Sequence, residues 1–165
     1  MQNFIKWVST ASRLFGVLSA LMILMAVLIT CEMIFVRFVL GQSTIWQTEI
    51  VVFLCVGATL LGLPYVQILK GHVNVDLIPS LLSPAKRKVL LGFSYLMSIG
   101  IIGIMFFYGF EAYYIALERN WKTETINEIP LWIPYLAMPV GFGLFVLQLI
   151  SDMLVQVFGV RSPQS

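Results

Sequence analysis

Residues 14–36 read LFGVLSALMILMAVLITCEMIFV, and Glu32 is the only charged residue in this stretch. A helix that crosses a bilayer needs about 20 apolar residues. Three further runs of this length contain no charged side chain, at residues 50–69, 89–110 and 129–151. Membrane strands would alternate polar and apolar residues, whereas these runs are apolar on every side. The sequence therefore predicts an all-α membrane protein with four transmembrane helices.

The composition indicates a membrane protein with a single domain over residues 1–165. Apolar residues make up 59% of the chain and charged residues 11%, whereas a soluble domain has about 25% charged residues. The net charge of +2, without a basic stripe, argues against nucleic-acid binding. His72 and two distant cysteines cannot form a metal cluster or a haem site, so we expect no cofactor and no enzymatic activity.

The positions of the cations predict the orientation in the membrane. With four spans, both termini and the segment 70–88 lie on one side and carry seven cations, against three on the other side. Short cytoplasmic loops are enriched in Lys and Arg, so we expect both termini in the cytoplasm. The helical spacing of apolar residues from Phe4 to Phe15 predicts a segment that lies at the interface before the chain turns into the membrane.

The connections between the spans carry signals for helix boundaries. Residues 44–47 (TIWQ) have the Thr-x-x-Gln form of a capping box, which predicts that the second helix starts there. In the segment 70–88, Asp76 can cap a short amphipathic helix that lies along the cytoplasmic surface. Ser83-Pro84 predicts the start of the third helix, and three cations follow at 86–88. Cations are disfavoured at a helix N-terminus, so this run indicates contact with anionic membrane lipids.

Charged residues near the outer face are expected to pair between helices. Glu32 and Arg37 are five residues apart on the first helix and point in different directions, so each needs a partner elsewhere. We expect Arg37 to pair with Glu49 across the outer turn. The alternative is that both side chains lie separately at the wet interface.

Small residues and prolines indicate where the helices pack and bend. Pro64, Pro134 and Pro139 predict kinks in the second and fourth helices. Small residues four apart allow two helix backbones to approach closely in a membrane. These small residues are Ser12, Gly16 and Ala20, Ala58 and Gly62, Ser94 and Ser98, and Ala137 and Gly141.

A set of motifs in order resembles one known family. The motifs are Arg37, residues 43–49 (STIWQTE), Leu61-Gly62, residues 71–76 (GHVNVD) and residues 130–141 (PLWIPYLAMPVG). Together, over about residues 10 to 155, they are similar to the small membrane subunit, DctQ-like, of tripartite ATP-independent periplasmic (TRAP) transporters. One departure is the Gln-Thr pair before the glutamate of the second motif, where many relatives have a second acid.

The resemblance implies a subunit of a sodium-coupled transporter in the bacterial inner membrane. In that family a large elevator-type membrane subunit carries the substrate pathway, and a periplasmic substrate-binding protein delivers an organic acid such as sialic acid or a dicarboxylate. We expect this chain to brace the large subunit and its outer segments, 46–49 and 118–128, to contact the binding protein. The residues that the resemblance marks as functional are Arg37, Trp46, Glu49, His72, Asp76 and Trp132. His72 also fits an interfacial residue that orders its own loop.

Two other classes of function are open from the residues alone. A self-contained homodimeric exporter of the small multidrug type would use Glu32 as its proton carrier. However, Glu32 lies late in its span and the cation bias predicts one fixed orientation. A glutathione-using membrane enzyme would need polar helix faces, which these spans lack. The scaffold is expected to co-purify with a larger membrane protein, whereas both rivals would form homo-oligomers.

Overall fold

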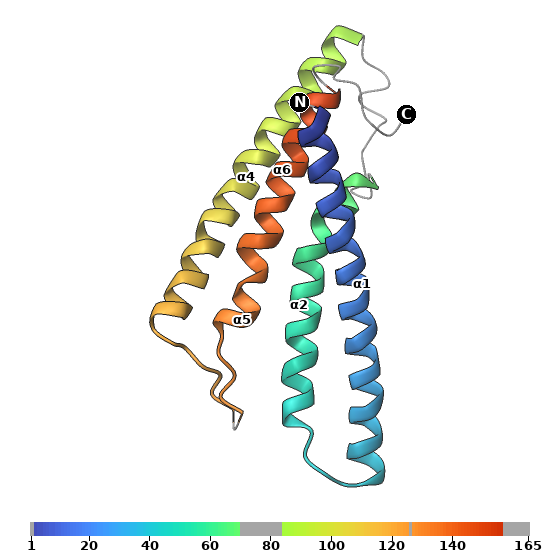
Figure 1. Cartoon of the computed structure of the whole chain (residues 1–165), viewed down its shortest axis with the longest axis vertical. Coiled ribbons are helices and arrows are strands. Elements are labelled where there is room, and N and C mark those ends of the chain that lie inside the picture. Colours follow the sequence, from blue (N-terminus) through green and yellow to red (C-terminus); the bar gives the residue numbers. More distant parts are fainter. Residues whose placement is uncertain (1, 70–83, 126, 157–165) are drawn as a thin grey trace.

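The computed structural model describes residues 2–69, 84–125 and 127–156. In this part of the chain the helices are α1 (Gln2–Val39), α2 (Ile45–Ile68), α4 (Pro84–Glu118), α5 (Trp132–Tyr135) and α6 (Ala137–Gln156) (Figure 1). Four helical units, α1, α2, α4 and the joined α5 and α6, are long and apolar enough to cross a membrane. The prediction of an all-helical chain with four spans is confirmed. The expected surface helix, with His72 and Asp76, lies outside the described residues.

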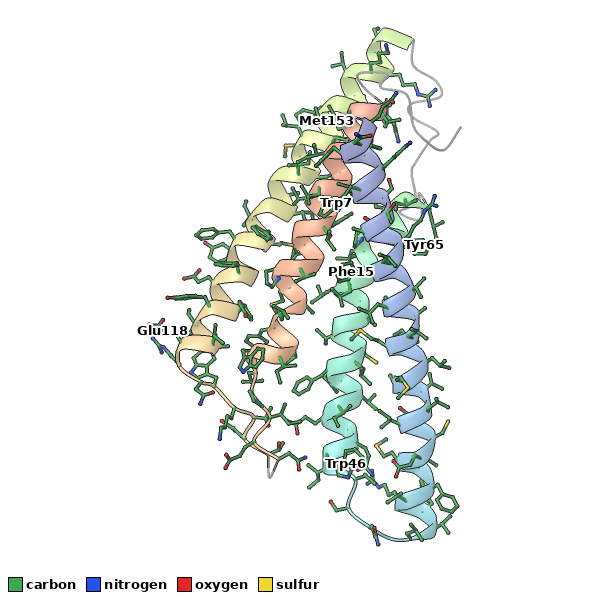
Figure 2. The ribbon with its side chains drawn as sticks, in the orientation of Figure 1. Trp7, Phe15, Trp46, Tyr65, Glu118 and Met153 are labelled. Atoms are coloured by element: carbon green, nitrogen blue, oxygen red, sulfur yellow. The ribbon has the colours of Figure 1, made fainter. Side chains whose placement is uncertain are left out.

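The first helix does not turn at the membrane surface as we expected for residues 4–15. α1 runs without a break from Gln2 to Val39. One side of its first turns is buried, with Val8 at 0% exposure, while Trp7 on the other side is 63% exposed. Packing of that buried side inside the bundle keeps the first turns aligned with the span. Figure 2 shows Trp7 at the same end of the molecule as Met153 in α6.

The third and fourth helices also differ from their predicted bounds. α4 has 35 residues, or about 52 Å of helix, which exceeds the roughly 30 Å hydrocarbon core. The fourth span begins at Trp132 and not at residue 129, because the N–H of Leu131 bonds to the carbonyl of Trp121 (2.8 Å) in a small hairpin. The helix is interrupted between α5 and α6, where Pro139 has no N–H for the carbonyl of Tyr135. The fourth span is thus interrupted between Pro134 and Pro139, two of the predicted kink positions, whereas α2 is one continuous helix through Pro64.

The described helices pack as two pairs. α1 lies along α2 and α4 lies along α6, while α6 also contacts both α1 and α2. α4 contacts only α5 and α6 among the described helices, so most of its circumference is uncovered. In Figure 1 the start of α1, the start of α4 and the end of α6 lie at one end of the molecule.

Small residues mediate the close contacts between these helices. A methyl group added at Gly141 in α6 would lie 2.5 Å from the carbonyl oxygen of Leu60 in α2, and one at Gly16 would strike the ring of Tyr65. Ser19 in α1 donates a hydrogen bond to the carbonyl of Ala58 in α2 at 2.6 Å. The small-residue prediction is confirmed for Ser12, Gly16, Ala58, Gly62 and Gly141, which are buried, whereas Ala20 and Ser94 are exposed in this chain.

We predict that Gly141→Ala destabilises the fold, whereas Gly103→Ala does not. The new methyl group at Gly141 would meet helix backbone that cannot move alone, and such overpacking costs about 1–3 kcal/mol. No atom lies within 4 Å of the position that a methyl group would take at Gly103. Alanine there gains about 0.8–1.0 kcal/mol of helix propensity. Thermal unfolding in detergent, followed by helical circular dichroism, measures the difference, and equal midpoints for the two variants would contradict this account.

Candidate functional site

Polar contacts between elements gather at the two ends of the bundle. Gln47 near the start of α2 and Gln67 near its end each donate a hydrogen bond to another helix. They are 20 residues apart, or about 30 Å along a helix, which matches the thickness of the hydrocarbon core. The two sets of polar contacts are therefore spaced like the two boundaries of a bilayer, and the hydrogen bond from Ser19 to the carbonyl of Ala58 lies between them.

The first set, which we name the Asp152 cluster, consists of Ser12, Gln67, Gln148 and Asp152. The amide groups of Gln67 and Gln148 each donate to a different carboxylate oxygen of Asp152, both at 2.9 Å. The hydroxyl of Ser12 donates to the amide oxygen of Gln148 at 3.2 Å. These contacts join α1, α2 and α6. Ser12 and Gln148 are 0% and 2% exposed, so bonding to one another satisfies groups that water does not reach.

Sequence reasoning missed the Asp152 cluster. Asp152 lies one residue beyond the predicted fourth span, and α6 continues past it to Gln156. A signal was present, because Gln148 and Asp152 are four residues apart and share one face of a helix. The third member, Gln67, is far away in sequence, and only the packing of α2 against α6 brings it to the carboxylate.

The second set, which we name the outer cluster, consists of Glu32, Gln47, Glu49 and Thr125. The amide of Gln47 donates to the carboxylate of Glu32 at 3.4 Å and joins α2 to α1. The hydroxyl of Thr125 donates to the carboxylate of Glu49 at 2.8 Å and joins the 119–131 connection to α2. Gln47 is 2% exposed, and its side-chain oxygen accepts no hydrogen bond from the described residues.

The expected ion pair between Arg37 and Glu49 is wrong. Glu49 bonds to Thr125, and the two charged groups form no ion pair in the described structure. Arg37 is exposed in the last turn of α1, where the helix dipole favours a cation. The contacts agree with the alternative, in which the side chains of Arg37 and Glu49 lie separately. Thr44 precedes α2 as predicted, but its side chain makes no capping bond.

The remaining predicted residues do not gather into one site. Trp46 is 46% exposed at the start of α2, at the end of the molecule opposite Trp7 (Figure 2). Trp132 is half-buried at the start of α5. Of the six residues, only Trp46 and Glu49 share one turn of helix, and His72 and Asp76 fall outside the described residues. The four described residues therefore lie at helix ends on the outer side of the bundle, on three different helices.

An apolar cavity of about 650 Å³ lies between α1, α2 and the start of the fourth span. Its lining in the described structure contains no charged or hydrogen-bonding side chain, and includes Met22, Phe53, Leu54, Ile133 and Val140. A carboxylate placed there would lose its hydration without gaining a partner. The described residues also contain no group of three or more His, Cys, Asp or Glu side chains that could hold a metal ion. The cavity therefore suits an apolar occupant.

The 119–131 connection forms a hairpin beside the outer cluster. The ammonium group of Lys122 bonds to the carboxylate of Glu128 at 2.8 Å. This hydrogen bond, with the positive charge of Lys122, lowers the pKa of the Glu128 carboxyl. The N–H of Thr123 bonds to the carbonyl of Ile129 at 2.9 Å and closes the hairpin.

Comparison with known families places most of the chain in a single one. The family described as tripartite ATP-independent periplasmic transporters, DctQ component, matches residues 25–159. The match includes both clusters except for Ser12. No curated protein matches the chain.

We predict that Asp152→Ala destabilises the bundle more than Glu124→Ala. Loss of the Asp152 carboxylate removes the acceptor from two amide groups, and each donor left unsatisfied costs about 1–3 kcal/mol. Glu124 is exposed and serves as the matched control. Unfolding midpoints in detergent measure the effect. Asp152→Asn keeps one oxygen acceptor and should fall between the wild type and Asp152→Ala; a midpoint for Asp152→Ala equal to that of the control would refute a structural role.

We predict that Lys122→Gln raises the pKa of the Glu128 carboxyl towards its usual range. Because the pKa of Glu128 is lowered in the folded chain, its pairing with Lys122 stabilises the hairpin at pH values above the ordinary glutamate pKa. This stabilisation is lost as the pH falls through the lowered pKa. NMR titration of the labelled glutamate carboxyl in both proteins measures the change. An identical titration in the variant would show that Lys122 does not cause the shift.

Proposed function

This chain belongs to the DctQ component family of TRAP transporters, and on that premise we propose that it is the small membrane subunit of a sodium-coupled importer of organic acids. Its partners are a large elevator-type membrane subunit and a periplasmic substrate-binding protein that delivers the acid, such as sialic acid or a dicarboxylate. It is a multi-pass protein of the bacterial inner membrane, and it performs no catalysis.

The observation that carries the proposal is the family match over residues 25–159. The distribution of polar groups supports a bracing role. The interhelical polar contacts of the Asp152 cluster and the outer cluster lie about 30 Å apart along α2. A transporter with its own pathway places ionisable groups near the bilayer midplane. The spans carry no charged side chain between the clusters, which is typical of a scaffold, and the substrate pathway belongs to the large subunit.

The outer cluster supports a contact surface for the binding protein. We expected two separate outer segments, 46–49 and 118–128, to meet that protein. The bond from Thr125 to Glu49 brings these segments together, so one surface can present both. Trp46 lies exposed beside it. With the termini in the cytoplasm, as the cation distribution favours, this surface faces the periplasm.

The remaining residues that the family resemblance marks are assigned to structural and partner contacts. Arg37 ends α1 beside the outer surface, and Trp132 begins α5 at the same end of the fourth span. A half-buried Trp at a helix start anchors a span at the membrane interface. On the proposed topology His72 and Asp76 belong to the cytoplasmic side, where they order their connection or meet the large subunit.

Reconstitution tests the bracing role. We predict that liposomes with the large subunit and the binding protein import the organic acid much more slowly than liposomes that also contain this chain. The physical reason is that a moving domain needs a stationary frame held in the bilayer. Full transport by the large subunit without this chain would refute the proposal.

Liposomes with this chain alone provide the control for the rival function. No solute flux is expected from them. Flux that is driven by a proton gradient and abolished by Glu32→Gln would instead support the homodimeric exporter. Purification from the membrane distinguishes the two functions independently. The bracing subunit should co-purify with the large subunit, whereas an exporter would purify as a homo-oligomer.

A further inference from the structure

The first turn of α4 carries three consecutive cations, Lys86, Arg87 and Lys88, and all three side chains are exposed. None of them forms an ion pair with an acid in the described residues. The helix dipole makes this position unfavourable for a cation by about 0.3–1 kcal/mol each. Such an arrangement is stabilised when anions lie around the helix end.

The geometry of three consecutive residues limits what the anions can be. Successive residues on a helix point 100° apart, so these three side chains spread over about 200° of the circumference. One acidic side chain of a protein partner could meet only one of them. A layer of anionic head groups surrounds the helix and can meet all three.

An apolar stripe continues from Lys86 along the same face of α4. Val89 and Phe93 follow at three and seven residues, and they are 74% and 61% exposed. Gly100 lies seven residues further on, and no atom comes within 4 Å of the position that a methyl group would occupy there. The stripe from Lys86 to Gly100 is about 21 Å long, which is more than one leaflet of the roughly 30 Å hydrocarbon core.

No other described helix covers this face of α4. α4 packs only on α5 and α6 among the described helices. The side of α4 that meets α6 includes Gly109, where an added methyl group would lie 3.0 Å from Met138. Gly109 and Phe93 lie about 160° apart around the helix, so the stripe faces away from the bundle. A cation above an exposed apolar stripe matches an anionic phospholipid, with its phosphate at Lys86 and an acyl chain along Val89 and Phe93.

We propose that the first turn of α4 and the stripe below it form a binding site for an anionic phospholipid of the adjoining leaflet. The cations supply selectivity for the head group, since each Lys or Arg near an anionic surface contributes about 1 kcal/mol, a factor of about five. The apolar stripe holds the chain against the helix. This site is independent of the transport role, so its failure would leave the proposed function standing.

Native mass spectrometry of the full chain tests the site. The protein is purified in detergent and incubated with equal amounts of phosphatidylglycerol and phosphatidylcholine, and the ratio of bound lipids is measured. The wild type should retain phosphatidylglycerol preferentially. Lys86→Gln with Arg87→Gln should lower that preference by up to about 30-fold, the product of two factors of about five. Added salt should lower it for the wild type as well, because salt screens exposed charges.

Two controls separate this site from general attraction to a basic surface. Lys6→Gln with Arg13→Gln removes one Lys and one Arg from α1, where both are exposed, and should keep the wild-type ratio. Phe93→Ala should reduce the number of lipids retained, whereas Phe107→Ala, which is on the same face but far from the cations, should not. A wild type without preference would overturn the proposal. An equal loss of preference in the α1 control, or no loss of lipid in Phe93→Ala, would also overturn it.

Discussion

The bilayer core offers no water to polar groups, and the rest of this structure depends on that constraint. Each backbone N–H and C=O in the core must bond within the protein, so the chain crosses as helices. Polar side chains in the spans bond to one another or to a backbone carbonyl, as Ser19 does to Ala58. The Asp152 cluster and the outer cluster meet this condition, and about 30 Å of helix with apolar packing separates them.

The two clusters join different parts of the bundle. The Asp152 cluster links α2 to α6 through the bond from Gln67 to the carboxylate, and α1 to α6 through the bond from Ser12 to Gln148. The outer cluster links α2 to α1 and to the hairpin that precedes α5. Between them, where lipid is as apolar as the side chains, close approach through Gly16, Gly62 and Gly141 provides the packing. Among the described helices, α4 contributes to neither cluster and contacts only α5 and α6.

This organisation suits a protein that acts through its surfaces. The cavity between the two helix pairs is lined by apolar residues and gives a carboxylate no partner. The outer cluster brings two segments of the chain into one surface, and α4 has a face that no other described helix covers. Membership of the DctQ component family assigns the chain to a transporter with other components. The surfaces proposed for the binding protein and for an anionic lipid lie at opposite ends of the molecule.

The sequence by itself determined the class of the protein, because four long apolar runs leave only transmembrane helices and an ordered set of motifs indicates the family. It also located the start of α2 and several glycine contacts, since both depend on local spacing. Only the tertiary structure decided that Glu49 meets Thr125 and not Arg37, that Gln67 meets Asp152, and that the first turns of α1 continue the span. The two contacts join residues 76 and 85 positions apart in the chain, and the first turns of α1 are buried against other helices. Periodicity reports which residues share a helix face, but the rotation and depth of one helix against another are set by packing, and no pattern within a single helix contains them.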